Sequence, residues 1–390
     1  MNILNINIHF FPDSYGGATV VAEKLAHGMG LDGNSVVNVS LNSNCTETSK
    51  KWDIIKTPFG SSIQLNGITP SLENRHFNIA ATSMLFEIYE LVKPEKIVIH
   101  AAQHMGIIHF LNNKEILKKS TIVAHDFFWC CYTGFRYLPS GEQCTNKLSY
   151  DNCKKCAFFP GVSEQLYISM IEILDKCNRL IFPSNYIKNE YEKIYRKKFS
   201  NSKVVSNPDF SESLSANFNQ FLKYKDVFKV GYFGGPGPQK GWDIVKKLIN
   251  TDLSVEGKKL SFILYDVGSI LGVSWYRAEC NLQNVNCTKP FHWSFAYQSI
   301  SQLDLVLMPS RVNESFGLVA REALSAGVKV VITARGALQE LDGFENVFVL
   351  HKEKDMKKVV QHALSVKAQQ NKGPQYKNMT ISKYVKEVLE

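Results

Sequence analysis

The stretch PSRVNESFGLVAREALSAGV, residues 309–328, decides the fold of this 390-residue chain. It follows an apolar run at residues 303–308, and a helix should begin at Ser315-Phe316-Gly317. Glu314 then lies in the loop before the helix, and Glu322 lies roughly one and a half turns inside it. Such an order of strand, loop and helix predicts an α/β unit with its ligands at the strand end.

The two carboxylates flank backbone amides at the start of this predicted helix. Amides at a helix N-terminus hold anions such as a diphosphate, and ionised carboxylates accept hydrogen bonds from the hydroxyls of a sugar or a ribose. Two simpler interpretations stay open at this point. Glu314 then serves only as a partner of the helix dipole, and Glu322 lies on a solvated helix face.

Short β-branched runs recur along the whole chain with helix-length segments between them. Because most of these runs are apolar throughout, they are typical of strands covered by helices on both faces. The rhythm predicts an α/β protein with parallel, doubly wound sheets. The expected strands are residues 3–10, 35–41, 96–100, 121–124, 179–182, 228–233, 260–264, 303–308, 329–332 and 347–350.

The length of the chain predicts two domains, since a single hydrophobic core stops growing beyond roughly 250–300 residues. The sequence turns polar between Asn207 and Asp226 before a new strand begins, so we place the junction there. We expect one Rossmann-like domain over residues 1–207 and a second over residues 208–375. Residues 376–390 have apolar side chains at helical spacing and predict a last helix.

Two glycine-rich turns precede predicted helices. Gly16-Gly17 follows the first strand, and Gly234-Gly235 follows the first strand of the second half, a few residues ahead of Lys240. Glycines let backbone amides approach an anion closely, and the lysine adds a positive charge. The second turn therefore predicts a phosphate site, whereas a simple tight turn explains the first equally well.

Four motifs along the chain together resemble the family 4 (group 1) retaining glycosyltransferases. They are Glu314 and Glu322 with seven residues between them, the Gly234–Gly241 loop, His125-Asp126, and Gly16-Gly17. The resemblance covers nearly the whole chain and implies the GT-B fold, in which two Rossmann-like domains face each other across a cleft. It also implies that the last helix, residues 376–390, returns to the first domain.

The resemblance implies roles for individual residues. His125, Glu314 and Lys240 are the expected catalytic group, with Lys240 on the donor diphosphate and His125 near the anomeric carbon. Glu322 is expected to bind the ribose. The full donor-binding set implied is Gly16, Gly17, Gly234, Gly235, Lys240, Ser315, Phe316, Gly317, Leu318 and Glu322. The implied reaction moves a sugar from a nucleotide-diphosphate sugar to a glycan or lipid-linked saccharide, with retention, as in surface polysaccharide biosynthesis.

The chain departs from the family pattern in two places. Gly235 stands where relatives usually carry an arginine, and Arg335-Gly336-Ala337 replaces their usual paired glycines. The sequence also has no Asp-x-Asp triplet, so we expect catalysis without a divalent ion held by that motif. Lys240 and helix amides would then stabilise the leaving diphosphate.

Five of the nine cysteines fall between residues 130 and 156, in a region, about residues 130–160, that the resemblance identifies as a cysteine-rich insertion. Cys131, Cys144, Cys153 and Cys156 form a candidate structural zinc site, because a two-residue spacing between thiolates suits a metal. An iron–sulfur cluster and unliganded thiols are the alternatives. The other cysteines are scattered, and we expect them to be buried or incidental.

Composition bounds the partners and the location of the protein. The net charge of +9 favours anionic ligands. Lys193, Arg196, Lys197 and Lys198 form either a solvated helix face or a patch for anionic lipid. No apolar run is long enough to span a bilayer, so we expect a cytoplasmic protein at the inner face of the membrane. We expect no nucleic-acid partner, because no nucleic-acid module is present.

Two other functions remain as alternatives to a glycosyltransferase. They are a sugar-nucleotide epimerase and a non-catalytic sugar-nucleotide-binding protein.

Overall fold

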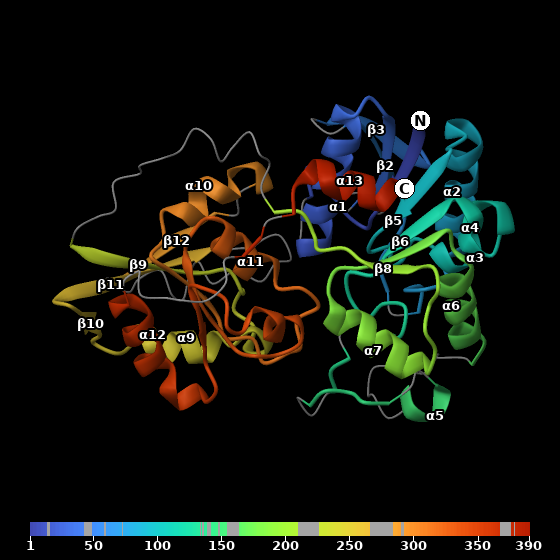
Figure 1. Ribbon diagram of the computed structural model, residues 1–390. Coiled ribbons are helices and arrows are strands. Elements are labelled where there is room, and N and C mark those ends of the chain that lie inside the picture. The colour runs from blue at the N-terminus through green and yellow to red at the C-terminus, as the bar shows by residue number, and fades with distance from the viewer. Residues whose placement is uncertain are drawn as a thin grey trace. The chain divides into compact units, whose positions relative to one another are not determined.

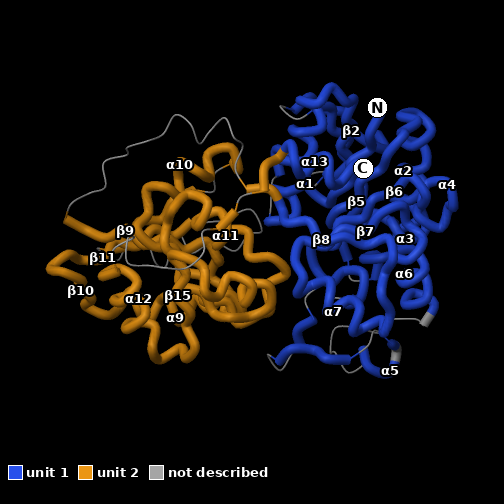
Figure 2. The backbone as a smooth tube through the Cα atoms, in the orientation of Figure 1, with its two compact units in different colours: residues 1–207, 382–390 blue, residues 208–381 orange. Residues whose placement is uncertain are grey.

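A computed structural model of the chain divides it into two units, Met1–Asn207 with Ser382–Glu390, and Pro208–Ile381. Figure 2 shows that both ends of the chain belong to unit 1. The structure describes residues 1–13, 16–42, 49–57, 60–71, 73–132, 134, 136–138, 142–146, 149–153, 164–209, 226–265, 284–289, 292–366, 376–377 and 379–390.

Within the described residues, unit 1 has an eight-stranded sheet in the order β3-β4-β2-β1-β5-β6-β7-β8. All neighbouring strands run parallel except β3 and β4, which are antiparallel. The strands are β1 (Asn2–Ile6), β2 (Ser35–Leu41), β3 (Trp52–Thr57), β4 (Gly60–Leu65), β5 (Lys96–Ile99), β6 (Ser120–Val123), β7 (Arg179–Phe182) and β8 (Ser202–Val204).

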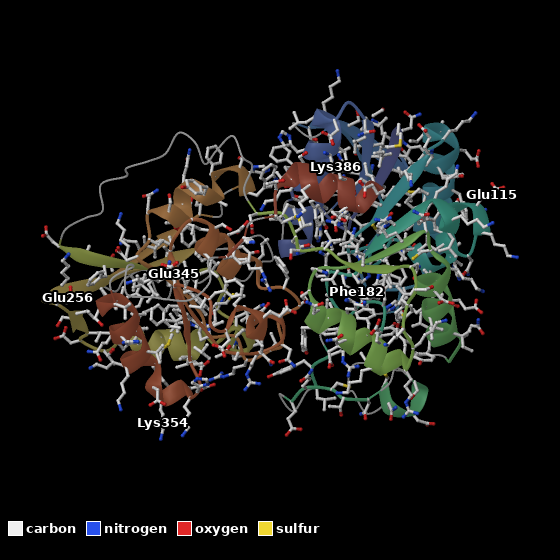
Figure 3. The ribbon with its side chains drawn as sticks, viewed as in Figure 1. Glu115, Phe182, Glu256, Glu345, Lys354 and Lys386 are labelled. Carbon is white, nitrogen blue, oxygen red and sulfur yellow. The ribbon has the colours of Figure 1, made fainter. Side chains whose placement is uncertain are left out.

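Helices cover both faces of this sheet, with α1 and α13 on one face and α2, α3, α4 and α6 on the other (Figure 1). The central strands are therefore buried on both sides and read as apolar runs. Figure 3 shows Phe182 inside the unit, while Glu115 and Lys386 project from its surface. The helices are α1 (Gly16–Leu31), α2 (Ile79–Val92), α3 (Ile107–Leu111), α4 (Lys114–Lys119), α5 (Tyr150–Cys153), α6 (Glu164–Lys176), α7 (Asn185–Tyr195) and α13 (Ile381–Leu389).

The last helix, α13, packs on unit 1 although it follows unit 2 in the chain. The Thr121 hydroxyl donates to the Val388 carbonyl at 3.3 Å, and the Arg179 guanidinium donates to the Glu387 carbonyl at 2.9 Å. The helix begins at Ile381, so the expected start at residue 376 was too early. The residues just before it group with unit 2.

Unit 2 has a seven-stranded sheet within the described residues, in the order β10-β11-β9-β13-β14-β15, with β12 also paired to β11. Its pairs are parallel except β10 with β11. The strands are β9 (Val227–Tyr232), β10 (Ser254–Val255), β11 (Lys258–Tyr265), β12 (Val285–Thr288), β13 (Leu305–Met308), β14 (Lys329–Ile332) and β15 (Val347–Val349).

Helices again lie on both faces, with α9 and α12 on one and α10 and α11 on the other (Figure 1). In α9 the apolar residues Ile244, Val245, Leu248 and Ile249 recur at helical spacing and are buried against the sheet. The helical segments are η1 (Pro238–Lys240), α9 (Trp242–Ile249), η3 (Trp293–Phe295), α10 (Ala296–Ser301), α11 (Leu318–Ser325), η4 (Ala337–Leu341), η5 (Glu353–Asp355) and α12 (Met356–Ser365).

The prediction of two α/β units with parallel, doubly wound sheets is confirmed. Strand β1 is shorter than expected and ends at Ile6, although the Asn7 amide still donates to the Val39 carbonyl at 3.1 Å. The Asn7 side chain also accepts from the Ala101 amide and donates to the Thr19 hydroxyl. Strands β3, β4, β8, β10 and β12 were not expected.

Among the helices of the described part of the chain, none combines the length and apolar character needed to cross a membrane.

Candidate active site

The strand order of unit 2 reverses between β9 and β13. From β9 the chain moves outward to β11, and from β13 it moves the opposite way to β14 and β15. The loops that leave the carboxyl ends of β9 and β13 therefore meet at a topological switch point, where open α/β sheets bind their ligands. These loops contain residues 233–241 and 309–317.

Lys240 and Glu314, one from each loop, are in direct contact. Lys240 Nζ donates to Glu314 Oε1 at 2.6 Å, and the Ser310 hydroxyl donates to the same oxygen at 2.7 Å. The Glu314 side chain is 12% exposed and that of Lys240 is 36% exposed. Since Oε1 is occupied twice, Oε2 is the oxygen that a ligand hydroxyl would reach.

Tyr232 contacts the glycine-rich loop through its hydroxyl group. Its hydroxyl lies 3.2 Å from the Gly235 carbonyl and 3.1 Å from the Lys240 carbonyl, which are the two ends of the loop. Burial raises the pKa of Tyr232, so the hydroxyl keeps its proton and donates to these carbonyls. A Cβ on Gly234 would lie 2.4 Å from this hydroxyl, which explains the glycine there.

Close backbone contacts fix the Glu314 loop. The Ala337 amide donates to the Glu314 carbonyl at 2.7 Å, and a Cβ on Gly336, at φ 62°, would lie 2.3 Å from that carbonyl. Gly317, at φ 78°, precedes α11 as its N-cap. The first-turn amides of α11 lack intrahelical acceptors and are available to an anion.

Arg321 is a residue that reading the sequence missed. It is 5% exposed, its Nε donates to the Phe316 carbonyl at 3.0 Å, and its Nη2 donates to the Ala337 carbonyl at 3.2 Å. Its guanidinium also lies 4.3 Å from the centre of the Phe316 ring. Arg321 therefore joins the loops after β13 and β14, although an arginine in a helix is by default read as solvated.

Arg311 joins the same loop to α9 and η5. Its Nη2 donates to Asp243 Oδ2 at 2.7 Å, and its Nε donates to Glu353 Oε1 at 2.6 Å. The hydrogen bonds from Arg311 lower the pKa of both carboxyl groups. The Arg311 amide also donates to the Gln239 carbonyl at 2.9 Å, so the loop before Glu314 is attached to the loop of Lys240.

Glu322 does not lie on a solvated helix face, because it is 5% exposed. It lies near Tyr376, whose pKa is raised by burial first and then by Asp209, with Glu322 adding a smaller contribution. The interpretation of Glu322 as a solvated residue is therefore wrong. Its burial fits a carboxylate held for a specific partner.

The strand order of unit 1 reverses between β1 and β5. His100 follows β5, and His125 follows the neighbouring strand β6. His100 Nδ1 lies 2.8 Å from His125 Nε2. Burial lowers the pKa of His125 to about 3 and that of His100 well below its ordinary value, so both rings are neutral at pH 7.

The other predicted residues of unit 1 take different positions. Asp126 is held by its own loop, with the Phe128 amide donating to Oδ1 at 2.8 Å, and burial raises its pKa. Gly16 and Gly17 are exposed and begin α1, with Gly16 at φ 75°. These glycines thus occupy a helix N-terminus at the switch point.

The cysteine prediction falls only partly on described residues. Cys131, Cys144 and Cys153 are not in disulfide bonds, and Cys156 lies outside the described residues. Within the described residues, no group of three or more His, Cys, Asp or Glu side chains is placed to hold a metal ion. Cys287 on β12 is disulfide-bonded, so the expectation that it is incidental was wrong.

The basic cluster near α7 is largely compensated. The helix ends at Tyr195, so three of the four basic residues follow it rather than lying on it. Lys193 Nζ lies 4.0 Å from Glu190 Oε1, and Lys197 Nζ lies 2.7 Å from Asp175 Oδ1. These pairs favour the solvated surface over a lipid patch.

The fold and the two switch-point loops define the GT-B class of glycosyltransferase folds. Sucrose-phosphate synthase from Thermosynechococcus elongatus aligns over 100% of this chain and 94% of its own, at a TM-score of 0.64 and 15% identity. Anabaena Alr3699/HepE in complex with UDP and glucose aligns over 100% of this chain and 98% of its own, at a TM-score of 0.62 and 15% identity. WaaG, a glycosyltransferase involved in lipopolysaccharide biosynthesis, aligns over 99% of this chain and 94% of its own, at a TM-score of 0.59 and 13% identity.

A family model matches most of unit 2. Residues 227–367 match the family described as glycosyl transferases group 1. The resemblance seen in the sequence is thereby confirmed. No curated protein matches the chain.

Proposed function

We propose that the protein is a retaining glycosyltransferase that moves a sugar from a nucleotide-diphosphate sugar to a glycan or lipid-linked saccharide. The observation that carries this proposal is the contact between Lys240 and Glu314 at the switch point of unit 2. The cation and the helix amides suit the diphosphate of such a donor, and the carboxylates of Glu314 and Glu322 suit the hydroxyls of its sugar and its ribose.

In the proposed reaction the bond between the anomeric carbon and the diphosphate oxygen breaks, and a bond to the acceptor oxygen forms. The acceptor's proton passes to the leaving diphosphate. Negative charge grows on that diphosphate, where Lys240 and the first-turn amides of α11 would stabilise it. Lys240 carries three N–H donors, so it can bind a phosphate oxygen while keeping Glu314.

Glu314 would orient the transferred sugar. With Oε1 held by Lys240 and Ser310, the carboxylate cannot rotate, and Oε2 would accept hydrogen bonds from sugar hydroxyls. Glu322 would bind the ribose from its buried position on α11. A similar structure supports this class of donor, since Anabaena Alr3699/HepE was crystallised in complex with UDP and glucose.

The experiment is a screen of nucleotide sugars for thermal stabilisation, followed by transfer of the labelled sugar to added saccharides. A donor that raises the melting temperature and yields a product of retained configuration, with activity unaffected by EDTA, is the expected result. Stabilisation without any transfer or hydrolysis identifies a non-catalytic binding protein. Conversion of the donor to its epimer identifies an epimerase, and no stabilisation by any nucleotide sugar overturns the proposal.

We propose further that the acceptor is assembled at the cytoplasmic face of a membrane, in surface polysaccharide biosynthesis. The support is the net charge of +9 and the likeness to WaaG. Because Lys193 and Lys197 are paired with carboxylates, we expect only weak, salt-sensitive binding to anionic vesicles. Vesicle sedimentation at low and high salt measures it, and equal binding at both salt concentrations contradicts the electrostatic contact.

A further inference from the structure

The pair formed by His100 and His125 sets the chemistry that unit 1 offers to a ligand. His100 Nδ1 lies 2.8 Å from His125 Nε2, the ring planes differ by 15°, and the ring centres are 5.1 Å apart. The centres are farther apart than the nitrogens by about the width of one imidazole ring. The rings therefore meet edge to edge in nearly one plane, which is the arrangement of a straight hydrogen bond.

Only one of the two nitrogens in this contact carries a proton. His100 is 1% exposed and His125 is 8% exposed, and both rings are neutral because burial disfavours the charged form. A neutral imidazole has one N–H and one bare nitrogen. The proton position in the contact therefore fixes the tautomer of both rings together.

The environment of His100 distinguishes the two arrangements. His100 Nε2 is buried and has no hydrogen-bond partner among the described residues. If His125 donated to His100, the proton of His100 would have to be on this Nε2, as a buried N–H with no acceptor. If His100 donates, its Nε2 carries only a lone pair. A buried N–H group without an acceptor is rarer in proteins than a buried acceptor without a donor, so donation by His100 is favoured.

We propose that His100 is a positioning residue that donates from Nδ1 to His125 Nε2 and so holds His125 as the Nδ1–H tautomer. Nδ1 of His125, the ring nitrogen outside this contact, is then a hydrogen-bond donor and not a base. It would recognise an oxygen atom, and, resting on the proposed function, we assign that oxygen to a hydroxyl of a saccharide that binds unit 1. His125 would not accept the proton of the acceptor hydroxyl.

Nitrogen NMR of the full-length protein, with histidine labelled at both ring nitrogens, tests the tautomer directly. The chain has 10 histidines, and the signals of His125 are those lost in the His125→Gln variant. We expect Nδ1 of His125 to show the shift of a protonated nitrogen and Nε2 that of a bare one. The opposite assignment overturns the proposal.

Variants of His100 test whether His100 sets the tautomer of His125. Asparagine can place an N–H close to the position of Nδ1, so H100N should keep the tautomer of His125, whereas H100L should release it toward a mixture. The control is H76F, because His76 is also a buried, neutral histidine of unit 1 and should leave the signals of His125 unchanged. An unchanged tautomer in H100L overturns the role of His100.

Kinetics separates this proposal from the proposed function. Once a donor sugar is known, H100L should lower kcat/KM by about tenfold, the effect of one lost hydrogen bond, and H100N should restore most of it. Equal losses in both variants, with a normal tautomer in H100N, contradict positioning. If the NMR result holds but no nucleotide sugar is bound or turned over, the tautomer stands and the glycosyltransferase proposal fails.

Discussion

The two units place different chemistry at the switch points of similar sheets. Unit 1 gathers uncharged histidines there, such as His100 and His125, whose rings are buried and neutral. Unit 2 gathers charges in contact, with Lys240 on Glu314 and Arg311 between two carboxylates. Neutral groups suit recognition of hydroxyls, and paired charges suit a diphosphate, so the two units differ in the kind of chemical group that each can bind.

The largest difference expected between the units is their response to acid. Burial holds the pKa of His76 and of His125 at about 3 and that of His100 well below its ordinary value of 6.5. Because these pKa values are lower in the folded state, the stability they contribute is complete above pH 6.5 and falls as the pH drops below it. His76 and His125 should each cost on the order of 2 kcal/mol of unfolding free energy between pH 7 and pH 5, and His100 acts in the same direction.

Unit 2 should resist the same acidification. The pKa values of Asp243 and Glu353 are lowered from 3.8 and 4.5, so their contribution is lost only as the pH falls below those values. Urea unfolding at pH 7, 6 and 5, with amide exchange resolved by unit, measures both effects. H76F should reduce the dependence of the unfolding free energy on pH. Unfolding of unit 2 before unit 1 on acidification would contradict the expected difference between the units.

The charged pair of unit 2 should dominate catalysis. Lys240→Ala removes the cation from the leaving diphosphate, and we expect turnover to fall by about two orders of magnitude, the scale of losing one transition-state donor. Steady-state kinetics with the identified donor measures it. Lys259 is exposed on β11 and K259A is the matched control; similar losses in both variants would remove the special role of Lys240.

The two glycine loops should differ in what they tolerate. A Cβ at Gly241, φ 77°, would lie 2.1 Å from the Pro309 carbonyl, whereas Gly16, φ 75°, has no atom within 4 Å of that position. Gly241→Ala should therefore destabilise by about 2 kcal/mol or more, and G16A by about 1 kcal/mol, the cost of the backbone conformation alone. Chemical denaturation compares them, and equal losses would show that space at Gly241 does not matter.

The smallest effect is expected at Arg311, which is partly exposed at 28%. Arg311→Lys keeps the charge but loses the paired hydrogen bonds to Asp243, so we expect a loss of about 0.5 kcal/mol and little change in turnover. Thermal unfolding and donor kinetics test this. A fall in turnover like that of K240A would mean that Arg311 acts on the reaction itself.

The parts of the fold that could be predicted are those whose residues are buried on both faces. The strands at Ser35–Leu41, Arg179–Phe182 and Lys329–Ile332 have the expected bounds, because most of their residues are buried and apolar. The edge strand β3 could not be found, since it is half exposed and Ile54 reaches 68% exposure, which mixes polar and apolar residues without a clear period.

The site was predictable in residue type but not in contact. Lys240 and Glu314 were identified from local motifs, yet their hydrogen bond joins residues 74 positions apart and depends on β9 lying beside β13. Arg321 gave no signal, because two of its partners are backbone carbonyls, of Phe316 and Ala337, that any sequence would supply, and its carboxylate partner, Glu340, lies 19 positions away. Strand order and main-chain acceptors are properties of the folded chain and not of the motif.

The attachment of α13 to unit 1 has a consequence for synthesis. Thr121 and Arg179 receive their partners at Val388 and Glu387, which leave the ribosome only after all of unit 2 has been made. The first unit to be translated thus waits for residues that arrive after the second, and its sheet keeps an uncovered area during that interval. Nascent chains halted before residue 382 should hence depend on chaperones more than released ones.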